Sequence, residues 1–162
     1  IFSQSSQKVL DLDLSRMYKL FSVNVGGMAS CLKHAARAMI DKSIKGSIVC
    51  MASVAATRGA ENWTDYCMSK HAVLGLMRCA SKQLGEHGIR VNCVSPYVVA
   101  TRTARRAFNM TVEELEEFFK LPNLRGMNVK AKNVADAVLF LASDESSCIP
   151  GTNLAVDGGF IS

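Results

Sequence analysis

The sequence has little that would mark a metalloprotein, a membrane protein or a nucleic-acid-binding protein. Its six cysteines include no Cys-x-x-Cys pair, the spacing typical of zinc ribbons and many redox sites. No apolar run approaches the roughly 20 residues that cross a bilayer. The net charge is only +5. The densest basic spot, at Arg102, Arg105 and Arg106, has no interleaved aromatic residues, which indicates a solvated or mobile loop.

What the sequence does have is the composition of a globular protein. Hydrophobic residues make up 49% and charged residues 20% of the 162 positions, enough for one domain with a sizeable core. Several cysteines lie within apolar runs, so we expect buried free thiols in a reducing, cytoplasmic compartment and no bound metal. A zinc site at Cys31 and His34 has little support, because this pair stands alone in the sequence.

The hydrophobic spacing alternates between helical periods and short apolar runs. Long stretches with apolar residues at helical spacing predict helices, and the short apolar runs are typical of strands buried on both faces. Their alternation predicts an α/β fold with a parallel sheet, which binds ligands beyond the carboxyl ends of its strands. The expected helices are 14–40, 63–87, 112–121 and 134–142, the last capped by Asn133, and the expected strands are 47–53, 90–94 and 153–156.

A tyrosine and a lysine four residues apart, Tyr66 and Lys70, lie on one face of the second long helix. An ammonium group beside a phenol stabilises the phenolate, and lowering the pKa of a tyrosine by about 3 units requires roughly 4 kcal/mol. Such a tyrosine can take the proton of an alcohol. Chance supplies about 0.2 such pairs here, but requiring Ser53 at the end of the buried strand lowers that to about 0.02.

Several motifs together carry a family resemblance. They are Asn24 in Ser22–Val25, Ser53, Tyr66–Lys70, Arg90–Pro96, Phe140–Asp144 and Val156–Gly159. With these motifs the chain resembles a short-chain dehydrogenase/reductase over essentially its whole length, and it is most similar to plant enzymes of the secoisolariciresinol and xanthoxin dehydrogenase type. The resemblance implies a Rossmann-type doubly wound parallel sheet.

The resemblance also implies catalytic roles. Tyr66 would be the acid/base, and Lys70 would lower its pKa and hydrogen-bond the nicotinamide ribose. Ser53 would hold the substrate oxygen, and Asn24 would anchor a water in the proton relay. The predicted catalytic residues are therefore Asn24, Ser53, Tyr66 and Lys70.

The segment after the second strand is expected to contact the cofactor and the substrate. By the resemblance, residues 101–129 match the substrate lid of the family, and their apolar side chains favour a hydrophobic alcohol or ketone. Tyr97 stands where the family usually has glycine. The predicted cofactor-binding residues are Tyr66, Lys70, Pro96, Val99 and Thr101, and the apolar lid residues are Met110, Phe118, Phe119 and Leu124.

One part of the family pattern is missing from these 162 residues. They contain no Gly-x-x-x-Gly-x-Gly turn, which would bind the pyrophosphate at a helix N-terminus, and no acidic residue that would select NAD. The chain also starts at Ile1. We therefore expect residues 1–162 to be the C-terminal part of the fold, without the N-terminal nucleotide-binding half, and to be inactive in isolation.

The sequence as a whole predicts an NAD(P)-dependent oxidoreductase that interconverts a hydrophobic secondary alcohol and its ketone. The plant resemblance favours NAD, with NADP as the other choice, and implies a homotetramer or homodimer for the full-length parent. The alternative is a catalytically inactive fragment that acts as an oligomerisation or interaction module. It would use the helices at 14–40 and 63–87.

Overall fold

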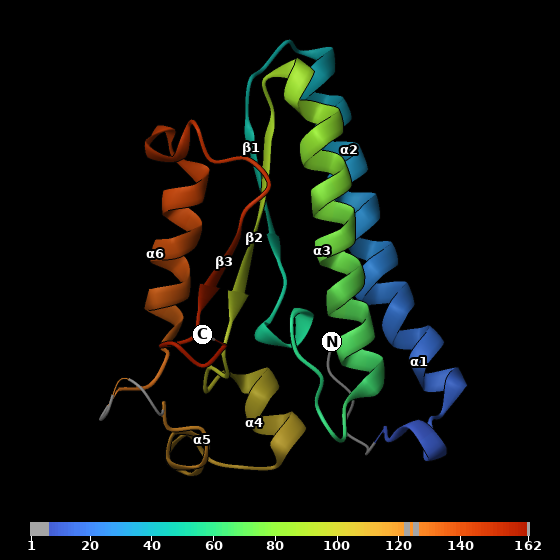
Figure 1. The fold of residues 1–162 in the computed structure, drawn as a ribbon, viewed down its shortest axis with the longest axis vertical. Coiled ribbons are helices and arrows are strands. Elements are labelled where there is room, and N and C mark those ends of the chain that lie inside the picture. Colours follow the sequence, from blue (N-terminus) through green and yellow to red (C-terminus); the bar gives the residue numbers. More distant parts are fainter. Residues whose placement is uncertain (1–6, 122–123, 125–126, 162) are drawn as a thin grey trace.

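The structure is a computed structural model that describes residues 7–121, 124 and 127–161. Its three strands form one sheet in the order β1-β2-β3, and both pairs are parallel. The predicted parallel α/β sheet is therefore confirmed (Figure 1). Within the described residues, β1 pairs only with β2 and leaves its other edge unpaired. The strands are β1 at Ser47–Met51, β2 at Arg90–Pro96 and β3 at Asn153–Val156.

Helices cover both faces of this sheet, as expected for a doubly wound fold. Helices α2 and α3 pack on one face, and α6 lies against all three strands on the other (Figure 1). The predicted long helices are present, at α1 Leu14–Phe21, η2 Ser22–Gly27, α2 Met28–Asp41 and α3 Thr64–Leu84, with α6 at Ala131–Ala142. Short 3₁₀ turns occur at Val9–Asp11, Val54–Ala56, Gly85–His87 and Asp144–Ser146.

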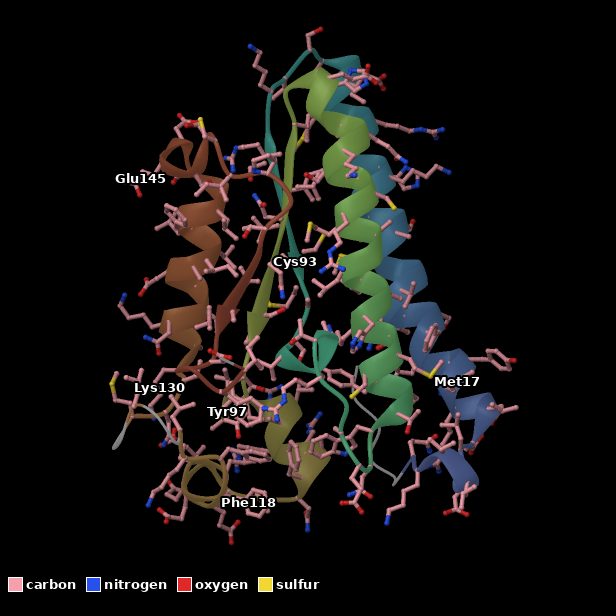
Figure 2. The ribbon with its side chains drawn as sticks, in the orientation of Figure 1. Met17, Cys93, Tyr97, Phe118, Lys130 and Glu145 are labelled. Atoms are coloured by element: carbon pink, nitrogen blue, oxygen red, sulfur yellow. The ribbon has the colours of Figure 1, made fainter. Side chains whose placement is uncertain are left out.

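The main core lies between α3 and the sheet. Val73 and Met77 of α3 are fully buried against Val91 and Cys93 of β2 and against Cys50 of β1. Figure 2 shows Cys93 inside this layer. As expected, Cys50 and Cys93 are free buried thiols, as is Cys67, whereas the free thiols of Cys31, Cys79 and Cys148 are exposed. None of the helices in the described part of the chain is long and apolar enough to span a membrane.

Two helices follow β2 at the carboxyl ends of the strands, α4 at Arg102–Phe108 and α5 at Val112–Phe118. The expectation of a loop at Arg102–Arg106 was therefore wrong: the Thr101 hydroxyl accepts a hydrogen bond from Ala104 N and caps a helix there. The predicted start of α6 was also too late. Asn133 is inside the helix, and its side chain accepts from the backbone N–H of Lys130. In the expected lid, residues 122, 123, 125 and 126 lie outside the described residues.

Buried polar side chains explain why the motif around β2 folds as it does. Arg90 donates to the carbonyl oxygens of Leu141 and Ser143 at the end of α6. Asn92 is fully buried, and its amide bridges the Ile149 carbonyl and the Thr152 N–H. These bonds join side chains of the central strand to backbone groups of other segments. They fix α6 and the start of β3 against the central strand.

The first turn of α3 contains a buried carboxyl group at Asp65. Its side chain is fully buried, and its Oδ1 accepts from the backbone N–H of Tyr66 at 2.7 Å. Its Oδ2 has no hydrogen-bond partner among the described residues. Burial, the largest effect, raises the pKa of Asp65 above the ordinary value of 3.8, although the hydrogen bond to Tyr66 lowers it. The fold therefore disfavours the ionised form of Asp65.

Asp65→Asn should stabilise the chain at neutral pH. The folded chain binds the Asp65 proton more tightly than the unfolded chain, so stability falls as the pH rises from about 4 through the folded pKa. Asparagine keeps the acceptor for Tyr66 N–H and carries no charge. We expect a gain of about 1–2 kcal/mol at pH 7 and a smaller loss of stability between pH 4 and pH 7, both measured by urea denaturation.

The matched control is Asp136→Asn, because Asp136 is exposed and pairs with Lys132 on the surface of α6. Its effect should stay within about 0.5 kcal/mol. A loss of stability in Asp65→Asn at pH 7 would contradict this account, since it would mean that the carboxylate is ionised and paired in the folded chain.

Candidate active site

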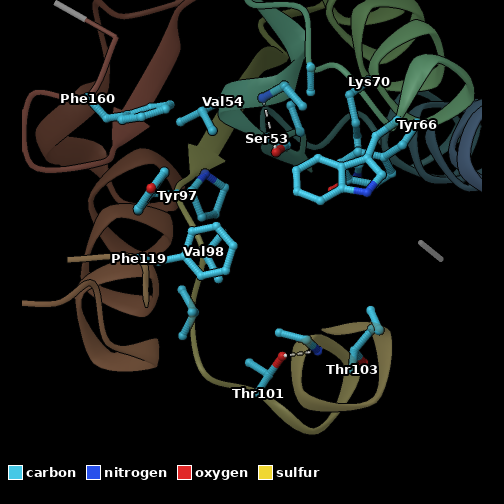
Figure 3. Close-up of a pocket in the computed structure, with 18 of the residues that line it drawn as sticks. Ser53, Val54, Tyr66, Lys70, Tyr97, Val98, Thr101, Thr103, Phe119 and Phe160 are labelled. Atoms are coloured by element: carbon cyan, nitrogen blue, oxygen red, sulfur yellow. Dashed lines mark hydrogen bonds between the residues drawn. The ribbon is translucent and has the colours of Figure 1, made fainter. Parts of the chain in front are cut away.

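A cavity of about 560 Å³ opens at the carboxyl ends of β1 and β2. Its walls come from the loop after β1, the start of α3, the loop after β2, and α4 (Figure 3). This is where parallel α/β sheets bind ligands. The structure brings all but one of the predicted site residues to this cavity: Ser53, Tyr66, Lys70, Pro96, Val99 and Thr101.

Ser53 comes shortly after β1, which ends at Met51, and caps the 3₁₀ turn at Val54–Ala56. Its backbone is extended, and its Oγ accepts a hydrogen bond from Ala55 N at 3.2 Å. The same side chain is hydrogen-bonded to the side chain of Tyr66. The turn therefore fixes the Ser53 hydroxyl beside the Tyr66 phenol at the cavity wall.

Tyr66 is half-buried in the first turn of α3. Burial, the largest effect, raises the pKa of Tyr66 above 10, while the hydrogen bond from Ser53 lowers it. The phenol is thus protonated at neutral pH in this structure. A role as base would require a nearby positive charge to offset the effect of burial.

Lys70 lies one turn further along α3, and it can supply such a charge. Its Nζ lies 5.6 Å from the centroid of the Tyr66 ring and donates to the Met51 carbonyl at 3.1 Å. Burial is the main effect on its pKa and lowers it. An ammonium group has three donors, and the bond to Met51 fixes Nζ next to the end of β1.

Asn24 is the predicted site residue that does not line the cavity. It is buried in the π-helical segment η2, where its Nδ2 donates to Ser69 Oγ at 3.1 Å. Ser69 Oγ in turn donates to the Tyr66 carbonyl at 2.8 Å. Asn24 therefore supports the helix that carries Tyr66 from behind. π-Helical turns are rare and are frequent at functional sites.

The side of the cavity formed by the loop after β2 suits a flat, weakly polar group. Pro96, Val99 and Thr101 line it next to Lys70. The Thr101 N–H donates to the Val99 carbonyl at 2.6 Å, which shapes a tight turn, and the Thr101 hydroxyl caps α4. That Pro96, Val99 and Thr101 contact a nicotinamide, and that Lys70 and Tyr66 hydrogen-bond its ribose, stay predictions.

Aromatic side chains also line the cavity, beside aliphatic and small residues, and the sequence did not predict Trp63, Phe108 or Phe160 among them. Phe119, an expected lid residue, does line the cavity, but Phe118 and Leu124 are 68% and 48% exposed and do not. Trp63, Phe108 and Phe160 come from segments distant in the sequence, so no local pattern pointed to them. The ring contacts are Trp63–Phe108 at 5.4 Å, Phe108–Phe119 at 5.0 Å, Tyr97–Phe119 at 6.0 Å and Tyr97–Phe160 at 4.4 Å.

The chain is similar to known proteins over nearly all of its residues. A family profile described as enoyl-(acyl carrier protein) reductase matches residues 1–161. The chain is 48% identical to a (+)-cis,trans-nepetalactol synthase of Nepeta racemosa, with 99% of this chain and 60% of that protein covered. It is 47% identical to the (−)-isopiperitenol/(−)-carveol dehydrogenase of Mentha piperita, covering 97% of this chain and 60% of that protein.

A further relative is short-chain dehydrogenase reductase 4 of Arabidopsis thaliana, at 50% identity over 94% of this chain and 51% of that protein. The chain thus spans about 60% or less of the length of these curated relatives.

Solved structures share the fold. A 4-hydroxyisoleucine dehydrogenase in complex with NADH has a TM-score of 0.84 at 27% identity, over 99% of this chain and 65% of that chain. Levodione reductase has a TM-score of 0.86 at 26% identity, over 98% of this chain and 63% of that chain. The profile match from residue 1 to 161, together with these relatives, shows that the chain belongs to the short-chain dehydrogenase/reductase family.

Proposed function

We propose that the protein is an NAD(P)-dependent oxidoreductase that interconverts a hydrophobic secondary alcohol and its ketone, with Tyr66 as the acid/base. The observation that carries the proposal is the meeting of Ser53, Tyr66 and Lys70 at one wall of a largely apolar cavity. The alternative, a catalytically inactive interaction module, gives no reason for a hydrogen-bonded serine and tyrosine beside a lysine at a cavity.

The substrate we propose is a cyclic, terpenoid-like alcohol or ketone. Aromatic side chains form part of the cavity wall, and the lining residues that the structure describes include no Asp or Glu. Such a wall favours an apolar ring over a polar or cationic molecule. Two relatives bear names that refer to terpenoids, a carveol dehydrogenase and a nepetalactol synthase.

A nicotinamide held by Lys70, Tyr66, Pro96, Val99 and Thr101 would supply the hydride-transfer chemistry at the carbinol carbon of the substrate. Ser53 hydrogen-bonds the substrate oxygen and orients it toward Tyr66. The Tyr66 phenol donates its proton to the ketone oxygen during reduction and takes that proton back during oxidation. The Lys70 ammonium stabilises the phenolate that forms in the reductive direction. The apolar wall excludes water from the reacting centre.

NAD and NADP both fit the residues that are present. Lys70, Tyr66, Pro96, Val99 and Thr101 would hold only the nicotinamide and its ribose, which the two cofactors share. We propose NAD from the plant resemblance alone.

Tyr66→Phe should lower turnover by at least about 100-fold, because it removes only the transferable proton. The assay is alcohol oxidation in the longest natural polypeptide that contains these 162 residues. Tyr18→Phe is the matched control, since Tyr18 is 65% exposed on α1 and its loss should leave turnover unchanged. Near-normal turnover in Tyr66→Phe would contradict the assignment of the acid/base.

Lys70→Met should weaken both catalysis and cofactor binding. Without the ammonium, the pKa of Tyr66 rises further, so the increase of the alcohol oxidation rate with pH should move to higher pH. The pH–rate profile and the Kd of NADH measure the two effects. Lys82→Met, on the exposed side of the same helix, should change neither, and an unchanged profile in Lys70→Met would make Lys70 merely structural.

The 162-residue chain by itself should bind NADH only weakly. It contains no Gly-x-x-x-Gly-x-Gly turn, and each hydrogen bond to a charged phosphate contributes about 1.5–3 kcal/mol. Losing several of them moves a micromolar site to the millimolar range or weaker. Isothermal titration with NADH tests this directly. A micromolar Kd would show that the nicotinamide end alone supplies most of the affinity.

A further inference from the structure

The turn at residues 157–161 contributes Phe160 to the wall of the active-site cavity. The Asp157 carboxylate accepts from Gly159 N and from Ile161 N, each at 3.0 Å, and the side chain is only 7% exposed. Gly158 and Gly159 both have positive φ, at 61° and 85°, a conformation that favours glycine. The turn therefore holds Phe160, which lines the cavity, in a defined position.

Arg58 ties this turn to the loop that follows Ser53. Its Nη1 donates to the Phe160 carbonyl at 2.9 Å, and its guanidinium carbon lies 4.7 Å from the centroid of the Phe160 ring. On the same ring, Tyr97 packs with a centroid separation of 4.4 Å. Cation–π and aromatic contacts of this kind are attractive. Phe160 is thus held by its backbone and by its ring.

The same turn supports the segment after α5. A Cβ atom placed on Gly158 would lie 2.3 Å from Leu121 Cδ1, so the buried Leu121 side chain packs directly on the glycine backbone. Phe119, two residues earlier, contacts Tyr97 on the cavity wall. The turn therefore contacts the loop with Arg58, Tyr97, and the segment after α5 that contains Leu121.

We propose that Phe160 is a specificity-determining residue and that Arg58 is the residue that positions it. Figure 3 shows Phe160 and Tyr66 on opposite sides of the cavity. A substrate whose oxygen is held at Ser53 and Tyr66 reaches Phe160 only if it has a bulky apolar body. Phe160 thereby favours cyclic alcohols over small ones. This inference rests on the proposed alcohol dehydrogenase activity.

The test compares kcat/KM for carveol, a monocyclic terpenoid alcohol, with kcat/KM for 2-propanol, in the longest natural polypeptide that contains these residues. Phe160→Ala should lower the value for carveol by about 10-fold or more, since apolar contacts in a pocket discriminate on this scale. For 2-propanol the value should stay within about twofold. Phe160→Leu, which keeps an apolar side chain, should lose less.

Tyr18→Ala is the matched control, because Tyr18 is an aromatic residue that is 65% exposed on α1 and does not line the cavity. It should leave both values unchanged. An equal loss for carveol and 2-propanol in Phe160→Ala would overturn the inference, because it would show a general structural role.

Arg58→Met tests the positioning role. It removes the hydrogen bond to the Phe160 carbonyl and keeps the length of the side chain. The ratio of kcat/KM for carveol to kcat/KM for 2-propanol should therefore fall by about 3-fold to 10-fold. In the double variant with Phe160→Ala, Arg58→Met should cause no further loss of the carveol preference, since both changes act through the Phe160 side chain. Additive losses would contradict this coupling. Arg106→Met, on α4 outside the cavity lining, is the control.

A second readout separates this inference from the proposed function. Trp63 is the single tryptophan of the chain and lines the cavity, so its fluorescence reports binding without turnover. Carveol should give a saturable change that weakens about 10-fold or more in Phe160→Ala. If no alcohol is oxidised but this difference in affinity appears, the proposed dehydrogenase activity is wrong, and the role of Phe160 in binding cyclic alcohols is supported. If carveol binds both proteins with equal affinity, the proposed role of Phe160 is wrong.

Discussion

One face of α3 determines where the chemistry lies. Tyr66, Lys70, Val73 and Met77 follow the helical spacing of i, i+4, i+7 and i+11, so they share a face. Val73 and Met77 are fully buried against the sheet, and burying two such side chains contributes roughly 3–6 kcal/mol. Because the helix cannot rotate without exposing them, Tyr66 and Lys70 must point toward the carboxyl ends of β1 and β2. The hydrogen bond from Lys70 to the Met51 carbonyl completes this arrangement.

The parallel register of β1 and β2 supplies the other half of the site. Met51 ends β1 and is paired with Val94, and β2 ends shortly after at Pro96. Ser53 and the loop after Pro96 therefore face the start of α3 together. A serine at a strand end, a tyrosine in a helix and a turn after the next strand become neighbours through the packing of one helix on two strands. The packing of α3 on β1 and β2 therefore also fixes the geometry of the candidate active site.

The hydrophobic spacing predicted most of this arrangement, because buried strands and amphipathic helices have clear periods. The prediction was wrong where the hydrophobic period of a helix is weak. At Arg102–Phe108 the helix depends on the Thr101 cap and carries three arginines, so its pattern resembled a loop. The site was predictable as far as Ser53, Tyr66 and Lys70, whose spacing is local. The contact between Arg58 and Phe160 joins residues 102 positions apart, which no local pattern encodes. The role of Asn24 in a water relay stays a prediction, since its amide binds Ser69 outside the cavity.

The central claim is that burial and the Ser53 hydrogen bond together set the proton affinity of Tyr66. A pH titration by NMR, with ¹³C at Cζ of the three tyrosines, measures this directly in the chain and in Ser53→Ala. The account predicts that Tyr66 titrates above the ordinary value of about 10 and that the pKa of Tyr66 rises further in Ser53→Ala. A pKa of Tyr66 at or below about 10 that is unchanged in Ser53→Ala would contradict it.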